Sequence, residues 1–188
     1  MVPVPVIDAH IHLDQYTPDD LDQVMKDAAA SGAEQLVAVS TGLASCEKTL
    51  NLSRLYPGRV LPAYGFHPEQ PLPEREELDR LLAWMFRHRE GMTAIGEVGL
   101  PYYLRKEAEA AGRAFVLSPY IELLDTFISL AVRWDKPIVL HAVYEDADRT
   151  IDRLQKYGLT RAHFHWYKGS QETTERLISA GFYISVTP

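Results

Sequence analysis

The sequence predicts a parallel α/β protein, and within that class a TIM-like (β/α)8 barrel rather than an open doubly wound sheet. Seven strand-like segments alternate with helical segments along the 188 residues, with short connections typical of a parallel sheet covered by helices. No glycine-rich phosphate loop follows the first strand, which argues against a dinucleotide-binding fold. We expect a single domain over residues 1–188.

The expected strands are alternating or continuous apolar segments bounded by turn residues. In the first strand, apolar residues alternate with Asp8, His10 and His12, so both imidazoles share one face. The later strands are apolar runs suited to burial in a parallel sheet. The seven expected strands cover residues 6–13, 35–41, 60–68, 93–100, 137–141, 161–166 and 182–186.

The expected helices combine helical spacing of apolar residues with start and stop signals. Thr17 followed by Pro18 and two acids indicates a helix start, and Gly158 indicates a helix end. Residues 101–117 are a longer polar stretch. Within it, residues 102–113 are predicted to form a solvated polar loop at the active rim, with a lid or a local phosphate contact as alternatives. The expected helices cover residues 17–32, 45–56, 75–89, 119–134, 146–157 and 171–180.

The sequence ends at Thr187 and Pro188, where the seventh strand should finish. We therefore expect a barrel that lacks its eighth strand and closing helix. Two explanations stay open: a further stretch of chain supplies them, or a second copy of the chain covers the open edge in a homodimer. Native proteins normally cover such edges.

Composition restricts the classes of function. Lys and Arg number 19 against 26 Asp and Glu, a net charge of −7, so any contact with nucleic acid must be local. Cys46 is the single cysteine; it excludes an internal disulfide and is predicted to be a small buried hydrophobe. Residues 1–5 contain no basic residue, and no apolar run approaches the length of a membrane span. We expect a cytoplasmic protein without a membrane partner.

Five metal-type side chains fall at or near the ends of predicted strands. In a β/α barrel these ends converge on one rim, where active sites are built. Each residue alone could be a hydrogen-bonded core residue or half of an ion pair, but together they favour a site for one or two divalent ions. A carboxylate can bridge two ions, and such a pair generates hydroxide at neutral pH. The five are His10, His12, Glu97, His141 and His165.

These segments resemble the TatD family of metal-dependent hydrolases, a branch of the amidohydrolase superfamily that includes magnesium-dependent deoxyribonucleases. The resemblance rests on the motifs IDAHIHL, GFHP, AIGEVGL, PIVLH, HWYKGS and GFYIS, in that order, around residues 7, 65, 94, 137, 165 and 181.

The resemblance implies a role for each of these residues. His10 and His12 would bind one metal, His141 and His165 a second, and Glu97 would bridge the two. His67 would face the substrate rather than a metal, so Glu97 and His67 are the expected catalytic residues. Two divalent ions are expected; histidine ligation favours Zn²⁺ or Mn²⁺, whereas the family label favours Mg²⁺.

Three departures from the family pattern affect the expected chemistry. Pro101 stands where the family has an Asp, and Val143 stands where it has an Arg that could hold a phosphate. The family's last metal-binding Asp, assigned as the base, lies on the eighth strand. We therefore expect a DNase or other phosphodiesterase, with two alternatives: hydrolysis of an amide, lactone or other ester, or a non-catalytic metal-binding relative.

Aromatic residues near the expected rim are candidates for substrate binding. Tyr103 lies in the polar segment after the fourth strand, and Trp166 follows the last expected histidine ligand. An aromatic ring at such a place can stack on a nucleic-acid base, or it can simply pack at the rim. His163 shares a face with His165 and is predicted to be a packed or hydrogen-bonded core residue.

Overall fold

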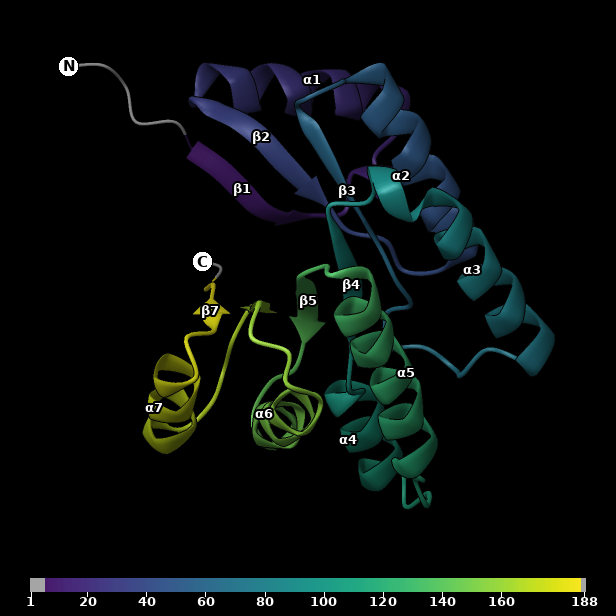
Figure 1. The fold of residues 1–188 in the computed structure, drawn as a ribbon, viewed down its shortest axis with the longest axis vertical. Helices are drawn as coiled ribbons and strands as arrows, with labels where there is room; N and C mark the ends of the chain where they lie inside the picture. The colour runs from purple at the N-terminus through teal and green to yellow at the C-terminus, as the bar shows by residue number, and fades with distance from the viewer. Residues whose placement is uncertain (1–5, 187–188) are drawn as a thin grey trace.

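The computed structural model describes residues 6–186, in which helices cover the outer side of one curved sheet (Figure 1). Residues 1–5, predicted to lead directly into the first strand, and residues 187–188, at the predicted end of the seventh, lie outside the described part. None of the helices within 6–186 is both long enough and apolar enough to cross a bilayer.

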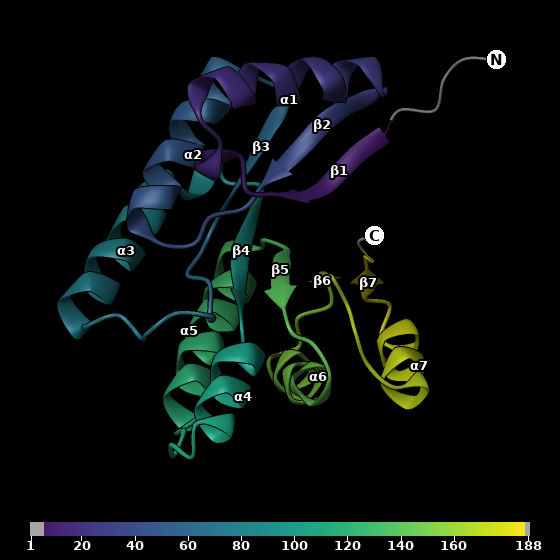
Figure 2. The ribbon, with the colours of Figure 1, turned by 180° about the vertical axis from the view of Figure 1, so that it is seen from behind.

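The sheet contains seven parallel strands in the order of the sequence, which confirms the parallel α/β, TIM-like class. The strands form a curled half-barrel, with β1 and β7 at the two ends of the arc (Figure 2). No described residue of β1 pairs with β7. The strands are β1 (Val6–Ile11), β2 (Ala33–Ala38), β3 (Val60–Tyr64), β4 (Ala94–Gly99), β5 (Ile138–His141), β6 (Ala162–His165) and β7 (Tyr183–Ile184).

The helices begin and end largely where local signals indicate. Thr17 accepts a hydrogen bond from the backbone N–H of Asp20 at the start of α1, as an N-cap does. Gly158 adopts a φ of 70° after α6, the left-handed conformation that glycine tolerates best. The helices are α1 (Pro18–Ala30), α2 (Leu43–Leu55), α3 (Arg75–His88), α4 (Tyr102–Ala110), α5 (Ser118–Trp134), α6 (Glu145–Tyr157) and α7 (Gln171–Ser179), with 3₁₀ turns η1 (Leu13–Gln15) and η2 (Arg89–Gly91).

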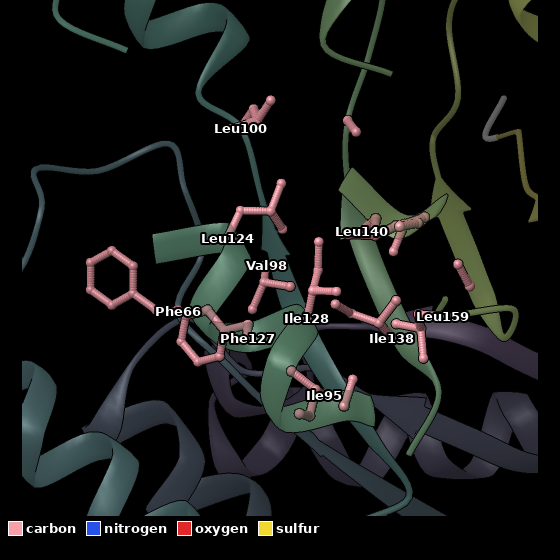
Figure 3. Packing of buried hydrophobic residues seen from close by; sticks show 14 of the residues in the cluster. Phe66, Ile95, Val98, Leu100, Leu124, Phe127, Ile128, Ile138, Leu140 and Leu159 are labelled. Carbon is pink, nitrogen blue, oxygen red and sulfur yellow. The ribbon is translucent and has the colours of Figure 1, made fainter. Parts of the chain in front are cut away.

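The largest hydrophobic core lies between α5 and the middle of the sheet. Figure 3 shows apolar side chains of α5 packed over the neighbouring strands β4 and β5. Burial of these side chains holds the centre of the sheet in place, and Cys46 belongs to the same core, as predicted. The side chains involved include Leu124, Phe127 and Ile128 from α5, Ile95 and Val98 from β4, and Ile138 and Leu140 from β5.

The prediction of a polar loop after the fourth strand was wrong, because residues 102–110 form α4. Its N-cap residue, Pro101, makes no side-chain cap. The free N–H groups of Tyr103 and Leu104 are instead bound by the carboxylate of Glu69, more than thirty residues earlier in the chain. Arg105 anchors α4 to α6 by donating to the buried Asp146 at 2.9 Å. These long-range contacts stabilise a helix whose own sequence lacks a start signal.

Candidate metal centre

Glu97 lies on a fully buried strand in the middle of the sheet. All six residues of β4 are buried, and the Glu97 side chain is 1% exposed. Gly99, two residues later, pairs with His141 on β5. A Cβ atom at Gly99 would lie 1.9 Å from the backbone oxygen of His141, so only glycine permits this close approach of the two strands. The local sequence therefore brings Glu97 and His141 to one place.

A first cluster joins Glu97 to His10 on β1 and to His12, the residue that follows β1. The Nε2 atoms of His10 and His12 lie 3.1 and 3.2 Å from Glu97 Oε2. The two Nε2 atoms are 3.4 Å apart, which confirms that the alternation along the strand aims both imidazoles to one side. A hollow of about 470 Å³ lies beside this cluster and is lined by His10, Ile11, His12, Gln15, Tyr16 and His165.

A second cluster uses the same carboxylate. His141 Nδ1 lies 3.3 Å from Glu97 Oε1, and His67 Nε2 lies 3.5 Å from Glu97 Oε2. His67 lies in the loop between β3 and α3. The third strand was expected to include this residue, but β3 ends at Tyr64. In each cluster the potential ligand atoms all lie within 4.8 Å of one another. Glu97 is the residue that the two clusters share.

The chemistry of these residues fits a divalent cation. Both oxygens of the Glu97 carboxylate are buried and accept no hydrogen bond of normal geometry, although histidine nitrogens surround them. Burial tends to raise the pKa of Glu97, but the surrounding histidines outweigh it and hold that pKa well below its usual value. A buried, ionised carboxylate among imidazoles is a typical donor set for Zn²⁺ or Mn²⁺.

His165, expected to ligate together with His141, pairs with it across β5 and β6, but its ring turns toward β1. Its ring stacks on that of His10, with centroids 3.3 Å apart, and it belongs to neither cluster found among the described residues. Burial lowers the pKa of His165 to about 3. His163 contacts Ser185 Oγ at 2.9 Å, in agreement with its predicted place in the core, and burial lowers its pKa to about 4.

Three side chains gather at the rim of the centre. Tyr103 at the start of α4 and Trp166 after β6 have ring centroids 6.1 Å apart, and the Tyr103 ring lies 6.1 Å from that of His141. Lys168 Nζ sits 3.7 Å above the Trp166 ring and 3.4 Å from the Tyr103 hydroxyl. Trp166 has a φ of 46°, an uncommon backbone conformation that clusters at functional sites. Lys168, which follows the last expected histidine ligand in the HWYKGS motif, was not among the predicted substrate-binding residues.

Glu69 is a second residue that the sequence analysis missed. Besides capping α4, its Oε1 lies 3.2 Å from His141 Nε2. No motif marks a glutamate after the His-Pro pair, so only the tertiary contact identifies it. The pKa of His141 is lowered by burial but raised more strongly by Glu69 and Glu97, to about 9.

Pro101 and Val143, which depart from the family pattern, both occupy buried positions. Val143 is fully buried, so it packs in the core and presents no side chain at the rim. Pro101 is buried and stands at the N-cap of α4. Neither residue offers a charged group to a substrate.

Comparison with known proteins agrees with this architecture. The family model described as TatD related DNase matches residues 7–188. A metal-dependent hydrolase of Haemophilus influenzae is 40% identical over 97% of this chain and 70% of its own length. Human deoxyribonuclease TATDN3 is 33% identical over 98% of this chain and 69% of its own length.

Solved structures point to the same family. The TatD homologue YjjV of Escherichia coli has a TM-score of 0.79 and 26% identity, over 95% of this chain and 66% of that one. The hydrolase TatD family protein of Entamoeba histolytica, at 18% identity and a TM-score of 0.76, shares the fold. The chain thus spans about two thirds of the length of these proteins.

The curved parallel sheet and the histidine and carboxylate clusters agree with these matches, which make the chain a metal-dependent hydrolase with a TIM-like α/β fold. Within that class it belongs to the TatD family.

Proposed function

We propose that this chain carries the metal centre of a nuclease that hydrolyses phosphodiester bonds in DNA. The observation that carries the proposal is the buried Glu97 carboxylate shared by two clusters of histidines. The printed name of the human relative, a deoxyribonuclease, supports the choice of DNA. The net charge of −7 requires that recognition of the polyanion be local to the site.

Glu97, His10, His12 and His141 would hold one or two divalent ions, with Zn²⁺, Mn²⁺ and Mg²⁺ as candidates. Bound divalent ions supply an activated water at neutral pH and neutralise charge on the phosphoester. His165, on the ring face of His10, would complete the ligand set, as the family resemblance implies. His67, with a side chain 20% exposed, is open to the substrate and would donate a hydrogen bond to it.

The rim residues would recognise the nucleotide. Trp166 and Tyr103 offer aromatic faces on which a base can stack. Lys168 carries a positive charge within reach of both rings and would contact a phosphate, a role that the buried Val143 cannot take.

A nuclease assay on the metal-loaded chain tests this proposal. We expect release of nucleotides from single- or double-stranded DNA, abolished in Glu97→Gln. It should fall about tenfold in Trp166→Ala, since base stacking contributes about 1–3 kcal/mol, and should also fall in Lys168→Met, which removes the charge that would contact a phosphate. Glu109→Gln, an exposed change on α4, is the matched control and should keep full activity. Metal-loaded chain without any nucleotide release would contradict the proposal.

Hydrolysis of an amide, lactone or other ester is the second candidate. The absence of a charged side chain at positions 101 and 143 favours it, because phosphate recognition then depends on Lys168 alone among the rim residues described above. A panel of phosphoester, lactone and amide substrates separates the two. Turnover confined to phosphoesters excludes the second candidate, and turnover confined to the others excludes the first.

Inactivity toward every substrate, with metal bound, would support the third alternative, a non-catalytic metal-binding relative. The cytoplasmic location expected from the sequence stays a prediction, and the homodimer stays one of two open explanations for the uncovered strand edge.

A further inference from the structure

Glu69 stands at the meeting point of the metal centre and helix α4. It lies in the loop between β3 and α3, two residues after His67, and its side chain is 15% exposed. Gln70 fixes this loop by donating to the backbone oxygens of Thr41 and His67 at 2.6 and 2.9 Å. Glu69 is therefore held in a defined position rather than in a mobile turn.

The carboxylate of Glu69 determines which nitrogen of His141 carries a proton. His141 Nε2 lies 3.2 Å from Glu69 Oε1, and its Nδ1 lies 3.3 Å from Glu97 Oε1. An ionised carboxylate can only accept hydrogen bonds, so the Nε2 atom facing Glu69 must be the donor. When a cation replaces the proton on Nδ1, the ring keeps its Nε2 proton on Glu69 and presents the Nδ1 lone pair to the second cluster. Such a partner fixes a ligating histidine in its tautomer and orientation.

The backbone of Glu69 gives His67 the same tautomer, but in His67 the protonated nitrogen is the one that faces Glu97. The N–H of Glu69 donates to His67 Nδ1 at 3.2 Å, and an N–H group can only donate. The neutral His67 ring therefore carries its proton on Nε2, the atom 3.5 Å from Glu97 Oε2. That nitrogen has no lone pair free for a cation and acts as a hydrogen-bond donor. His141 is prepared to ligate, and His67 is not.

Glu69 also fixes the helix that carries the rim. Its Oε1 accepts from the N–H of Tyr103 at 2.8 Å, and its Oε2 accepts from the N–H of Leu104 at 2.7 Å. Pro101 provides no side-chain cap, so these bonds satisfy two of the free donors at the start of α4. One carboxylate thus orders both a metal ligand and the backbone of a rim residue.

We propose that Glu69 is a positioning residue that holds His141 in its ligating tautomer, leaves His67 as a donor and ties α4 to the metal centre. The inference rests on the metal centre of the proposed function, but not on the choice of DNA as substrate.

The test measures metal affinity and tautomers, independently of activity. Zinc affinity of the chain and of Glu69→Gln is determined by competition with a chromophoric chelator. Glutamine removes the charge but keeps the backbone N–H, so we expect a 10- to 100-fold loss of affinity, the usual effect of losing an outer-shell partner. Long-range ¹H–¹⁵N correlation spectra of the zinc-loaded wild type should show both His141 and His67 protonated at Nε2, with only His141 coordinated.

One control variant and one fallback measurement make the result decisive. Glu109→Gln, on the same helix but paired only with Lys106 and Arg105, should bind zinc as the wild type does. If Glu69→Gln fails to fold, the spectra of the wild type decide alone. Unchanged zinc affinity in Glu69→Gln, a His141 ring protonated at Nδ1, or a wild-type chain that binds no zinc would each overturn the proposal. Loss of zinc affinity in a chain without nuclease activity would uphold it and contradict only the proposed function.

Discussion

Strands β4 and β1 both carry side chains of the same centre, yet they lie in very different surroundings. Every residue of β4 is buried between β3 and β5 and under α5. β1 has a strand on one side only among the described residues, and its Val6 and Ile7 are 51% and 54% exposed. Glu97 and His141 are therefore supported by the core, whereas His10 and His12 depend on an edge. The difference teaches that Glu97, rather than the pair His10 and His12, is the most firmly held residue of the metal centre.

The largest expected effect tests the contrast between centre and edge directly. Phe127→Ala removes a buried ring of α5 from the core and should lower the free energy of unfolding by about 3–5 kcal/mol. Tyr183→Ala, at a β7 residue that is 73% exposed, should change it by less than about 0.5 kcal/mol. Urea unfolding of both variants measures the two values. Equal losses would show that the edge is as tightly packed as the centre.

A smaller effect is expected from acid. His163 has a pKa of about 4 in the folded chain, against 6.5 for the ordinary value. Between these values the unfolded chain binds a proton and the folded chain does not, so the free energy of unfolding should fall as pH drops from 6.5 toward 4, by up to about 3 kcal/mol.

The variant His163→Gln isolates this contribution, because glutamine can still bond to Ser185. His165, whose pKa is about 3, acts in the same direction, so the variant should lose less stability in acid than the wild type without losing all the dependence. Identical pH profiles for unfolding of the two proteins would rule out the assigned role of His163 burial.

The smallest effect concerns α1, the helix beside the β1 edge. Thr17→Ala removes the side chain that accepts from the N–H of Asp20 and should cost about 1 kcal/mol of stability. Thr17→Ser keeps the oxygen and should restore it. Thermal unfolding of the wild type and the two variants measures this effect. A Thr17→Ala protein as stable as the wild type would mean that α1 contributes little to cooperative unfolding.

The fold could be predicted from the sequence because its signals are local. Alternation along β1 placed His10 and His12 on one side, and Thr17 and Gly158 marked helix ends correctly. Helix α4 escaped prediction because its cap, Glu69, lies more than thirty residues away. The residue pattern within 101–117 gives no indication of the hydrogen bonds from this stretch to Glu69.

The sequence could predict most of the residues that form the candidate site, but not which of their side chains contact one another. Strand ends identified His10, His12, Glu97 and His141, and the structure brings them together. It pairs His165 with His141 across β5 and β6 but stacks the His165 ring on that of His10, and the direction of a ring cannot be predicted from the order of strand ends. The separate roles of His67 and His141 depend on Glu69, which only the tertiary structure brings to them.

The central claim, that Glu97 serves both clusters, is tested most directly by metal analysis of Glu97→Gln. The wild-type chain and the variant are reconstituted with Zn²⁺ or Mn²⁺, freed of excess metal and analysed for metal per chain, with circular dichroism to check folding and Glu109→Gln as control. We predict roughly two ions per wild-type chain, as in dinuclear hydrolases, and none in the variant, because both clusters include this carboxylate. A folded Glu97→Gln protein that retains the wild-type metal content would contradict the claim.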